Sequence, residues 1–392
     1  MAFVMKRPTP RSKGLLVLTH KELPHVLLEL PAFSAIVARL REHYVIGVHY
    51  GWFRSGLTPV SWVDFHFAPE STVTFEAGER VRALPFNSSH FVPAFFREEQ
   101  LAKQWDIVSV TRPVAFKNTD ELLRSLRLVR DRRPSTRALI VCSGTTETRE
   151  PEALGALWRQ YQTSFSLRER QDIVLLPFEL EGPPFPFPRR DIAWLYNSSR
   201  LFTLFSSREG GSKAIKEALL CGLPVVLRRG LLGGGLEFAT PDNSRLFADE
   251  REAAEAMLEV LEHPVRFRVD TQALARRANE TYTVPQLLER LAQLYAELGL
   301  VWEGEVDTED LGMKLPSHHP ELLPPDLRGH WTSDLPSSRA ALAFFTRLVA
   351  EASGDARLRR RDQARVQLST WARHGEGYLR SLRRRVRRGS RA

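Results

Sequence analysis

The sequence has few cysteines and no long apolar run. Only two of its 392 residues are cysteines, Cys142 and Cys221, which are too few for a disulfide framework or a zinc site. Both lie in apolar segments, so we expect buried small side chains. No apolar run approaches the roughly 20 residues that a membrane-spanning helix needs. Residues 15–19 are also too few for the apolar core of a signal peptide, and we therefore expect a cytoplasmic protein.

Positive charge is concentrated in the C-terminal tail. The chain has a formal net charge of +9, but from Arg357 to the end 13 arginines stand against two acidic residues, which leaves −2 for the rest. A basic body would indicate a nucleic-acid surface, whereas a basic tail is a local feature. Three interpretations of the tail stay open. It is a solvated extension, an attachment to anionic lipid on the inner face of the membrane, or a nucleic-acid-binding segment, although we expect no nucleic-acid partner for the body.

Strands and helices alternate from Trp105 onward. The segments typical of buried strands are 106–110, 137–142, 172–176, 201–205 and 224–227. The helical patterns between and after them are 119–132, 151–165, 190–196, 212–220 and 250–262. This alternation predicts an α/β fold with a doubly wound parallel sheet that is covered on both faces.

The regions before and after this pattern are less regular. The expected elements before it are strands at 15–19 and 44–49, a helix at 31–42, and short strands within 63–75 and 80–85. Those after it are helices at 283–298 and 337–351, with a proline-rich irregular stretch at 304–336 between them. We therefore divide the chain into residues 1–104, 105–300 and 301–392.

A glycine pair opens one of the predicted helices. Gly210 and Gly211 have no Cβ atom, so their backbone amides can approach a ligand closely. Ser212 is a plausible N-cap of the helix that follows. The free N–H groups at a helix start suit a diphosphate, and Lys213 adds a positive charge.

Two carboxylates bracket this turn. Glu209 and Glu217 are separated by seven residues, and each carboxylate can accept two hydrogen bonds from the vicinal hydroxyls of a ribose or hexose. Spacing alone leaves another interpretation open, in which Glu217 pairs with Lys213 on a solvated helix face.

The same segment resembles a known family. Glu209 and Glu217, followed by Cys-Gly-Leu-Pro-Val-Val at 221–226, resemble the E-x7-E signature of retaining GT-B glycosyltransferases of the glycosyl transferases group 1 type. Arg112 and Lys117 resemble the Arg-x4-Lys pair that follows the first strand of that family's donor domain. The resemblance covers about residues 45–298 and is strongest between 106 and 262.

The resemblance implies a role for each matching residue. Arg112 and Lys117 contact the donor diphosphate and stabilise the leaving group, because preorganised cations offset the charge that develops there. Glu217 binds the ribose, and Glu209 lies beside the transferred sugar. The amides of Gly210, Gly211 and Ser212, together with Lys213, hold the sugar or phosphate.

One histidine and the cofactor expectation also follow from the resemblance. His49 lies at the carboxyl end of a predicted strand, where α/β folds gather ligands, and it resembles the Val-x-His of the family's first domain. We therefore count it among the catalytic candidates. GT-B enzymes usually need no bound metal, so we expect neither a metal nor a cofactor.

The family's domain plan departs from this sequence at the start. Only about 100 residues precede Trp105, so the resemblance implies that 1–104 is a reduced acceptor-side α/β domain. Residues 105–300 would be the Rossmann-like nucleotide-sugar domain, and 301–392 a linker, a helix and the arginine-rich tail. A partner protein could complete the first domain.

The activity that the resemblance implies is sugar transfer. A GT-B-like fold would move a sugar from a nucleotide sugar to a saccharide or lipid-linked acceptor, with retention, in cell-surface polysaccharide or lipopolysaccharide biosynthesis. The alternative is a non-catalytic nucleotide-sugar-binding subunit that needs a partner chain.

Overall fold

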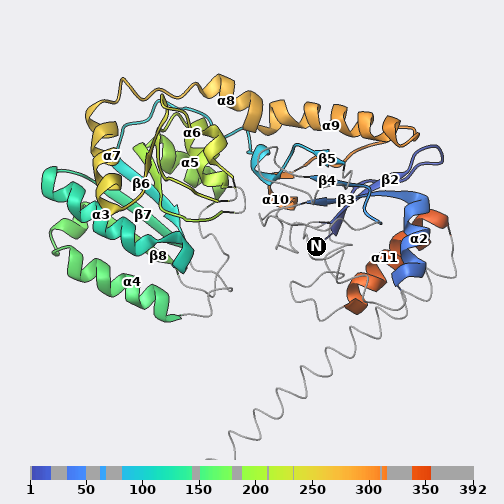
Figure 1. The fold of residues 1–392 in the computed structure, drawn as a ribbon, viewed down its shortest axis with the longest axis horizontal. Helices are drawn as coiled ribbons and strands as arrows, with labels where there is room; N and C mark the ends of the chain where they lie inside the picture. Colours follow the sequence, from blue (N-terminus) through green and yellow to red (C-terminus); the bar gives the residue numbers. More distant parts are fainter. Residues whose placement is uncertain are drawn as a thin grey trace, which may run out of the picture.

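The structure is a computed structural model, and it describes residues 2–18, 33–49, 62–67, 82–143, 151–178, 188–209, 212–232, 234–309, 311–315 and 338–354. Two α/β domains lie side by side, and the long helix α9 (Glu280–Glu297) runs from one to the other along the top of Figure 1. Each domain has its own sheet, with five strands in the first domain and six in the second.

The first sheet has the strand order β1-β2-β3-β4-β5. Its strands are β1 (Ala2–Lys6), β2 (Gly14–Leu18), β3 (Tyr44–His49), β4 (Phe65–Phe67) and β5 (Ala83–Leu84). β1 is antiparallel to β2, and the other neighbours are parallel. Every residue of β2 and β3 is buried, which explains their unbroken apolar sequence, because side chains cover both faces of the sheet.

Helices from distant parts of the chain complete the first domain. α2 (Phe33–His43) precedes β3, and α11 (Ser338–Ser353) packs against α2. Figure 1 shows α9 above this sheet, with α2 and α11 below and beside it. Side chains of α9 and α11 join the same buried cluster as β2 and β3, so the core of this domain draws on both halves of the chain.

The stretch expected to be irregular after α9 contains some regular structure. Val306 forms an antiparallel bridge with Lys6, and the N–H of Asp307 donates to the carbonyl of Met5 at 2.7 Å. A short helix, α10 (Leu311–Lys314), follows. The rest of the predicted irregular stretch, from residue 316, lies outside the described residues, as does the basic tail.

The second sheet is doubly wound, as the sequence predicts. Its six parallel strands have the order β11-β10-β9-β6-β7-β8. They are β6 (Trp105–Thr111), β7 (Ala138–Ser143), β8 (Ile173–Phe178), β9 (Ser199–Leu204), β10 (Val225–Arg228) and β11 (Ser244–Phe247). The order changes direction between β6 and β9, the central pair, and such a switch point is where open α/β sheets bind ligands.

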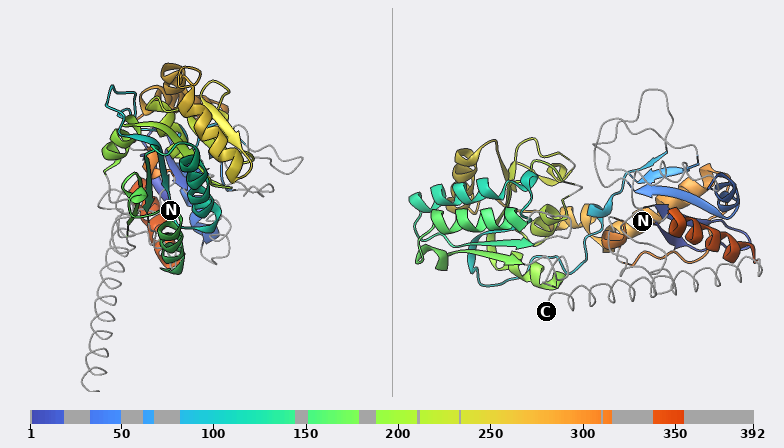
Figure 2. Two further views of the ribbon diagram at one scale, coloured as in Figure 1. Left: turned by 90° about the vertical axis from the view of Figure 1, so that its left-hand side faces the viewer. Right: turned by 90° about the horizontal axis from the view of Figure 1, so that it is seen from below.

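Helices cover both faces of this sheet. Those packed on one face are α3 (Thr119–Arg132), α4 (Pro151–Ser164) and α7 (Glu250–Glu262). Those on the other are α5 (Arg189–Asn197), α6 (Lys213–Leu220) and α8 (Thr271–Ala278). The view from below in Figure 2 shows the second domain as a compact unit beside the first. Cys142 and Cys221 are buried and free, as expected.

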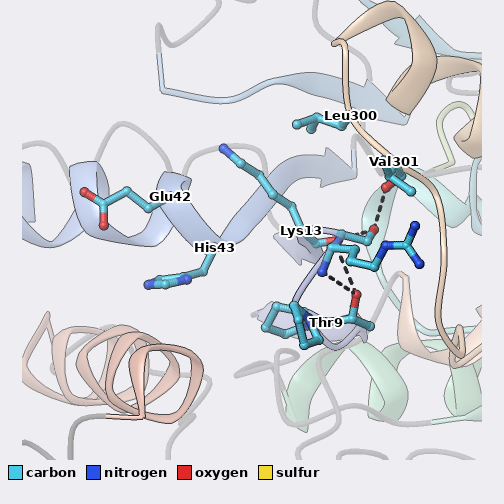
Figure 3. A pocket seen from close by; sticks show the side chains of 10 residues that line it. Thr9, Lys13, Glu42, His43, Leu300 and Val301 are labelled. Atoms are coloured by element: carbon cyan, nitrogen blue, oxygen red, sulfur yellow. Dashed lines mark hydrogen bonds between the residues drawn. The ribbon is translucent and has the colours of Figure 1, made fainter.

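A hollow of about 250 Å³ lies at the amino ends of β2 and β3. Figure 3 shows Lys13, Glu42 and His43 around it, with Val301 accepting a hydrogen bond from Ser12. Parallel sheets bind ligands at the carboxyl ends of their strands, and none of the predicted site residues lines this hollow.

Gly47 in β3 predicts a measurable effect on stability. A Cβ atom there would lie 2.3 Å from Cζ of the fully buried Phe65, so Gly47→Ala should lower the free energy of unfolding by about 1–3 kcal/mol through overpacking. The control is Gly155→Ala in α4, where the nearest atom is 3.6 Å away and helix propensity should raise stability by about 0.5–1 kcal/mol. Urea unfolding measures both, and equal effects of the two variants would contradict the packing argument.

Candidate functional site

The candidate site begins where β6 and β9 end, at the switch point of the second sheet. Ile107 pairs with Leu201 and Val108 with Phe202, so the two chain segments leave the sheet next to one another. One segment carries Arg112 and Lys117, and the other carries Glu209. Topology thus brings together residues that are about a hundred positions apart in the sequence.

An unusual backbone conformation sets the position of Lys117. Lys117 ends a short 3-10 turn, Ala115–Lys117, and Asn118 follows in the left-handed region with φ 46° and ψ 43°. Asparagine tolerates this conformation better than most residues. The Asn118 side chain donates to the carbonyl of Phe205 at 3.0 Å, and the N–H of Ser207 donates to the carbonyl of Phe116 at 2.8 Å. These bonds join the loop after β6 to the loop after β9.

Glu209 is held from its other side by the loop after β10. Its N–H donates to the carbonyl of Leu232 at 2.7 Å, and Arg208 forms a parallel bridge with Leu232. In this position the carboxylate accepts a hydrogen bond from Nζ of Lys117, and both side chains are only 12% exposed. Burial lowers the pKa of Lys117, whereas Glu209 opposes that shift and the nearby Arg112 adds to it.

Arg112 supplies a positive charge that the site does not neutralise. It is half-buried, and within the described part of the chain no carboxylate forms an ion pair with it. Arg112 and Lys117 lie five residues apart in the segment after β6, and the charge of Arg112 lowers the pKa of Lys117. Two cations against the single carboxylate of Glu209 leave a net positive charge, which suits an anionic ligand.

The helix predicted to bind phosphate is α6. Ser212 occupies its N-cap position, as expected, but the Ser212 side chain makes no capping hydrogen bond. The first backbone N–H groups of the helix therefore have no side-chain cap. Gly210 and Gly211, which precede it, lie outside the described residues.

Glu217 has a different hydrogen-bond partner from the one that its spacing suggests. It is 8% exposed, and its Oε1 accepts a hydrogen bond from Nη2 of Arg189 at the start of α5. The interpretation as a solvated helix face is therefore wrong. Nothing in the sequence marked Arg189, because a basic residue after a proline-rich stretch carries no specific signal. Its guanidinium also lies 5.2 Å from the ring centre of Phe96.

Lys213 lies close to this pair. Burial and, to a smaller extent, Arg189 lower the pKa of Lys213, Glu217 opposes both effects, and the resulting pKa is about 7. The ammonium group at the start of α6 therefore loses its proton near neutral pH.

His49 approaches from the first domain. It is fully buried at the end of β3, and its Nε2 accepts a hydrogen bond from the N–H of Ser88 at 3.1 Å. Burial lowers its pKa to about 3, with further contributions from Lys213 and His90. The imidazole is therefore neutral with its proton on Nδ1, and Nδ1 has no hydrogen-bond partner among the described residues. Ser88 is adjacent to Ser89, which accepts a hydrogen bond from Lys216 of α6, so His49 lies near the interface between the domains.

Lys216 is the second residue that the sequence analysis missed. It lies one turn after Lys213 in α6, is completely buried, and forms an ion pair with Glu237 at 3.5 Å. Burial lowers its pKa to about 8, although Glu237 opposes that shift. In an amphipathic helix pattern a lysine at this position is typical of an exposed face, so nothing in the sequence marked it.

The described ranges hold neither a metal-binding cluster nor a membrane-spanning helix. No group of three or more His, Cys, Asp or Glu side chains there is arranged to hold a metal ion. No helix within those ranges has the length and apolar character to cross a membrane.

The second domain matches a known protein family. Residues 105–263, which hold all six strands of the second sheet and α7, match the family model described as Glycosyl transferases group 1. This match covers less than half of the chain. A search of curated protein sequences found no match.

Solved structures resemble the chain in fold. TarM of S. aureus aligns with a TM-score of 0.50 and 13% identity, over 67% of this chain and 53% of TarM. HepE of Anabaena, in complex with UDP and glucose, aligns with a TM-score of 0.49 and 16% identity, over 71% of this chain and 78% of HepE. The C-terminal domain of LpcC from Francisella tularensis aligns with a TM-score of 0.38 and 16% identity, over 48% of this chain and 96% of that domain. The chain thus spans about half the length of TarM, and it has a GT-B-like fold.

Asn118 predicts a stability effect at the base of the site. Asn118→Ala should lower the free energy of unfolding by about 1–2 kcal/mol, because alanine disfavours the left-handed conformation and loses the bond to Phe205. Asn118→Gly can keep the left-handed conformation, so its free energy of unfolding should fall by less. Urea unfolding of the two variants separates the effects, and a glycine variant less stable than the alanine variant would argue against backbone conformation as the cause.

Lys216 predicts a pH dependence of stability. The unfolded chain keeps this proton up to about pH 10.5, whereas the folded protein releases it near pH 8. Between these values the unfolded state binds more protons, so the free energy of unfolding should rise with pH by up to about 1.4 kcal/mol per unit.

The difference between the wild type and Lys216→Met isolates this effect. Tyrosines and cysteines, which titrate at high pH, are common to both proteins and cancel. The free energy of unfolding of the wild type minus that of Lys216→Met should increase from pH 8 to pH 9 and again to pH 10. A constant difference would show that the folded and unfolded forms hold this proton equally.

Proposed function

We propose that the chain is a glycosyltransferase that moves a sugar from a nucleotide-sugar donor to a saccharide or lipid-linked acceptor. The observation that carries this proposal is the contact between Lys117 and Glu209, with Arg112 nearby, at the switch point of the second sheet. That contact lies within the domain that matches the Glycosyl transferases group 1 model.

The positive side of the site suits the donor diphosphate. As the bond between the sugar carbon and the diphosphate oxygen breaks, negative charge grows on the departing group. Arg112 and Lys117 are already in place to stabilise that charge, so they lower the barrier without reorganising at the moment of reaction. Lys213 and the uncapped amides at the start of α6 would add to the same effect.

The two carboxylates suit the hydroxyl groups of the donor. Glu217 gives one oxygen to Arg189 and has a second oxygen with which to accept hydrogen bonds from the ribose. Glu209, held by Lys117, would face the transferred sugar. The new bond forms from an acceptor hydroxyl oxygen to the sugar carbon, and that hydroxyl loses its proton. The neutral His49 lies on the acceptor side of the interface.

The finer assignments belong to the same proposal. We propose retention of anomeric configuration, no metal or cofactor, and a role in cell-surface polysaccharide or lipopolysaccharide synthesis at the inner face of the membrane. The arginine-rich tail would provide the membrane contact.

Lys117→Ala should separate this function from others. We expect kcat for transfer or donor hydrolysis to fall about a hundredfold to a thousandfold, as when one preorganised donor of an oxyanion site is removed. A panel of nucleotide sugars serves as donors. The matched control is Lys103→Ala, because Lys103 lies just before β6 and donates to the carbonyl of Asn197 in the second domain at 2.7 Å, away from the site.

The outcomes distinguish the competing functions. Equal turnover by the wild type and Lys117→Ala would contradict the proposal. A wild type that binds nucleoside diphosphate, measured by thermal shift, but turns over donor only when another protein is added would favour the non-catalytic subunit.

A further inference from the structure

The two domains meet through a turn of the first domain and helix α6 of the second. We call residues 87–90 the interface turn. Nζ of Lys216 donates a hydrogen bond to Oγ of Ser89 in this turn, and both side chains are completely buried. On its own domain the same ammonium group pairs with Glu237 at 3.5 Å and lies 4.4 Å from the ring centre of Phe238. Lys216 therefore links both domains through one buried charge.

Hydrogen bonds within the interface turn hold its conformation. Asn87 caps it, since its Oδ1 accepts the N–H of Ser89 at 2.9 Å and its own N–H donates to Nδ1 of His90 at 3.1 Å. The N–H of Ser88 donates to Nε2 of His49. The group that holds His49 and the group that binds Lys216 thus belong to two adjacent residues, Ser88 and Ser89.

Neither covalent connection between the domains is a continuous helix or strand. Residues 93–104 connect the interface turn to β6 without a helix or strand. On the return path, Asn279 breaks the helix between α8 and α9, and α9 carries Pro285 in its second turn. A proline inside a helix removes one backbone hydrogen bond and permits a bend.

A charge at the position of Lys216 costs stability. The neighbouring buried positions of α6, such as Ile215, Ala218 and Leu219, are apolar. An apolar residue would fill the same space without removing an ammonium group from water. A buried polar group of this kind can specify one arrangement among several that apolar packing would allow.

We infer that Lys216 is a positioning residue that fixes the angle between the two domains and thereby holds His49 against the donor-binding helix. The geometric part of this inference stands alone. Its consequence for catalysis rests on the proposed function.

Spin labels on the two domains test the geometry in the full-length chain. Arg39 in α2 and Glu255 in α7 are exposed and belong to different domains. After Arg39→Cys and Glu255→Cys substitution they can be labelled selectively, because burial raises the pKa of the native Cys142 thiol to about 12 and also raises that of Cys221. We expect one narrow distance distribution by pulsed electron paramagnetic resonance.

Two variants break the link at different points. Lys216→Met removes the ammonium group, and Ser89→Ala removes only its acceptor in the first domain. Both should broaden and shift the distance distribution. Arg245→Met is the matched control, because its ion pair with Glu259, at 2.8 Å, lies within the second domain. It should leave the distribution narrow.

Kinetics add a second measurement. In both variants kcat for transfer should fall about a hundredfold, since a misplacement of about 1 Å is enough for such a loss. The Kd for nucleoside diphosphate should stay at the wild-type value, because Arg112 and Lys117 are untouched.

Different experimental results would contradict this inference and the proposed function. A narrow, unshifted distribution in both Lys216→Met and Ser89→Ala would overturn the positioning role. If Lys216→Met does not fold, Ser89→Ala decides. A wild type that binds no nucleoside diphosphate would instead remove the proposed function, while the distance measurement would still test the geometry.

Discussion

The whole arrangement depends on two parallel strands that pair with each other and then send the chain in opposite directions. β6 continues toward β7 and β9 toward β10, so the loops beyond their carboxyl ends are left facing one another. The hydrogen bonds from Asn118 to Phe205 and from Ser207 to Phe116 join these loops. Lys117 can then reach Glu209, and a net positive charge results beyond the carboxyl ends of these strands.

Much of this arrangement could be predicted from the sequence, because buried parallel strands have apolar runs without alternation. β3 begins and ends at the predicted residues, as do α3 and α7. Short or edge elements were missed for physical reasons. β11 contains Ser244 and Arg245 and is partly exposed, so its sequence is typical of a loop. α8 has only two buried residues, Leu274 and Ala278, too few for a clear helical period.

The residues of the candidate site also fall into two groups, those that a sequence pattern indicates and those that only the folded chain reveals. Glu209 and Glu217 could be proposed because their spacing belongs to a local motif, and Lys117 because, with Arg112, it resembles a pair that follows the first strand of the family's donor domain. Arg189 and Lys216 could not be found, since their importance arises from partners that only the folded chain brings near. Arg189 meets Glu217 across two helices, and Lys216 meets Ser89 across two domains. Residue pairs of this kind have no fixed spacing in the sequence from which the contact could be predicted.

The path of the chain also affects how the protein is made. The core of the first domain includes β2 and β3 together with Phe344 and Phe345 of α11, whereas the second domain is continuous from β6 to α7. During synthesis the second domain can complete its sheet while the first domain still lacks helix α11, which supplies part of its core. The domain that is translated first is therefore the one that finishes folding last, and its exposed strands must wait for a helix more than two hundred residues downstream.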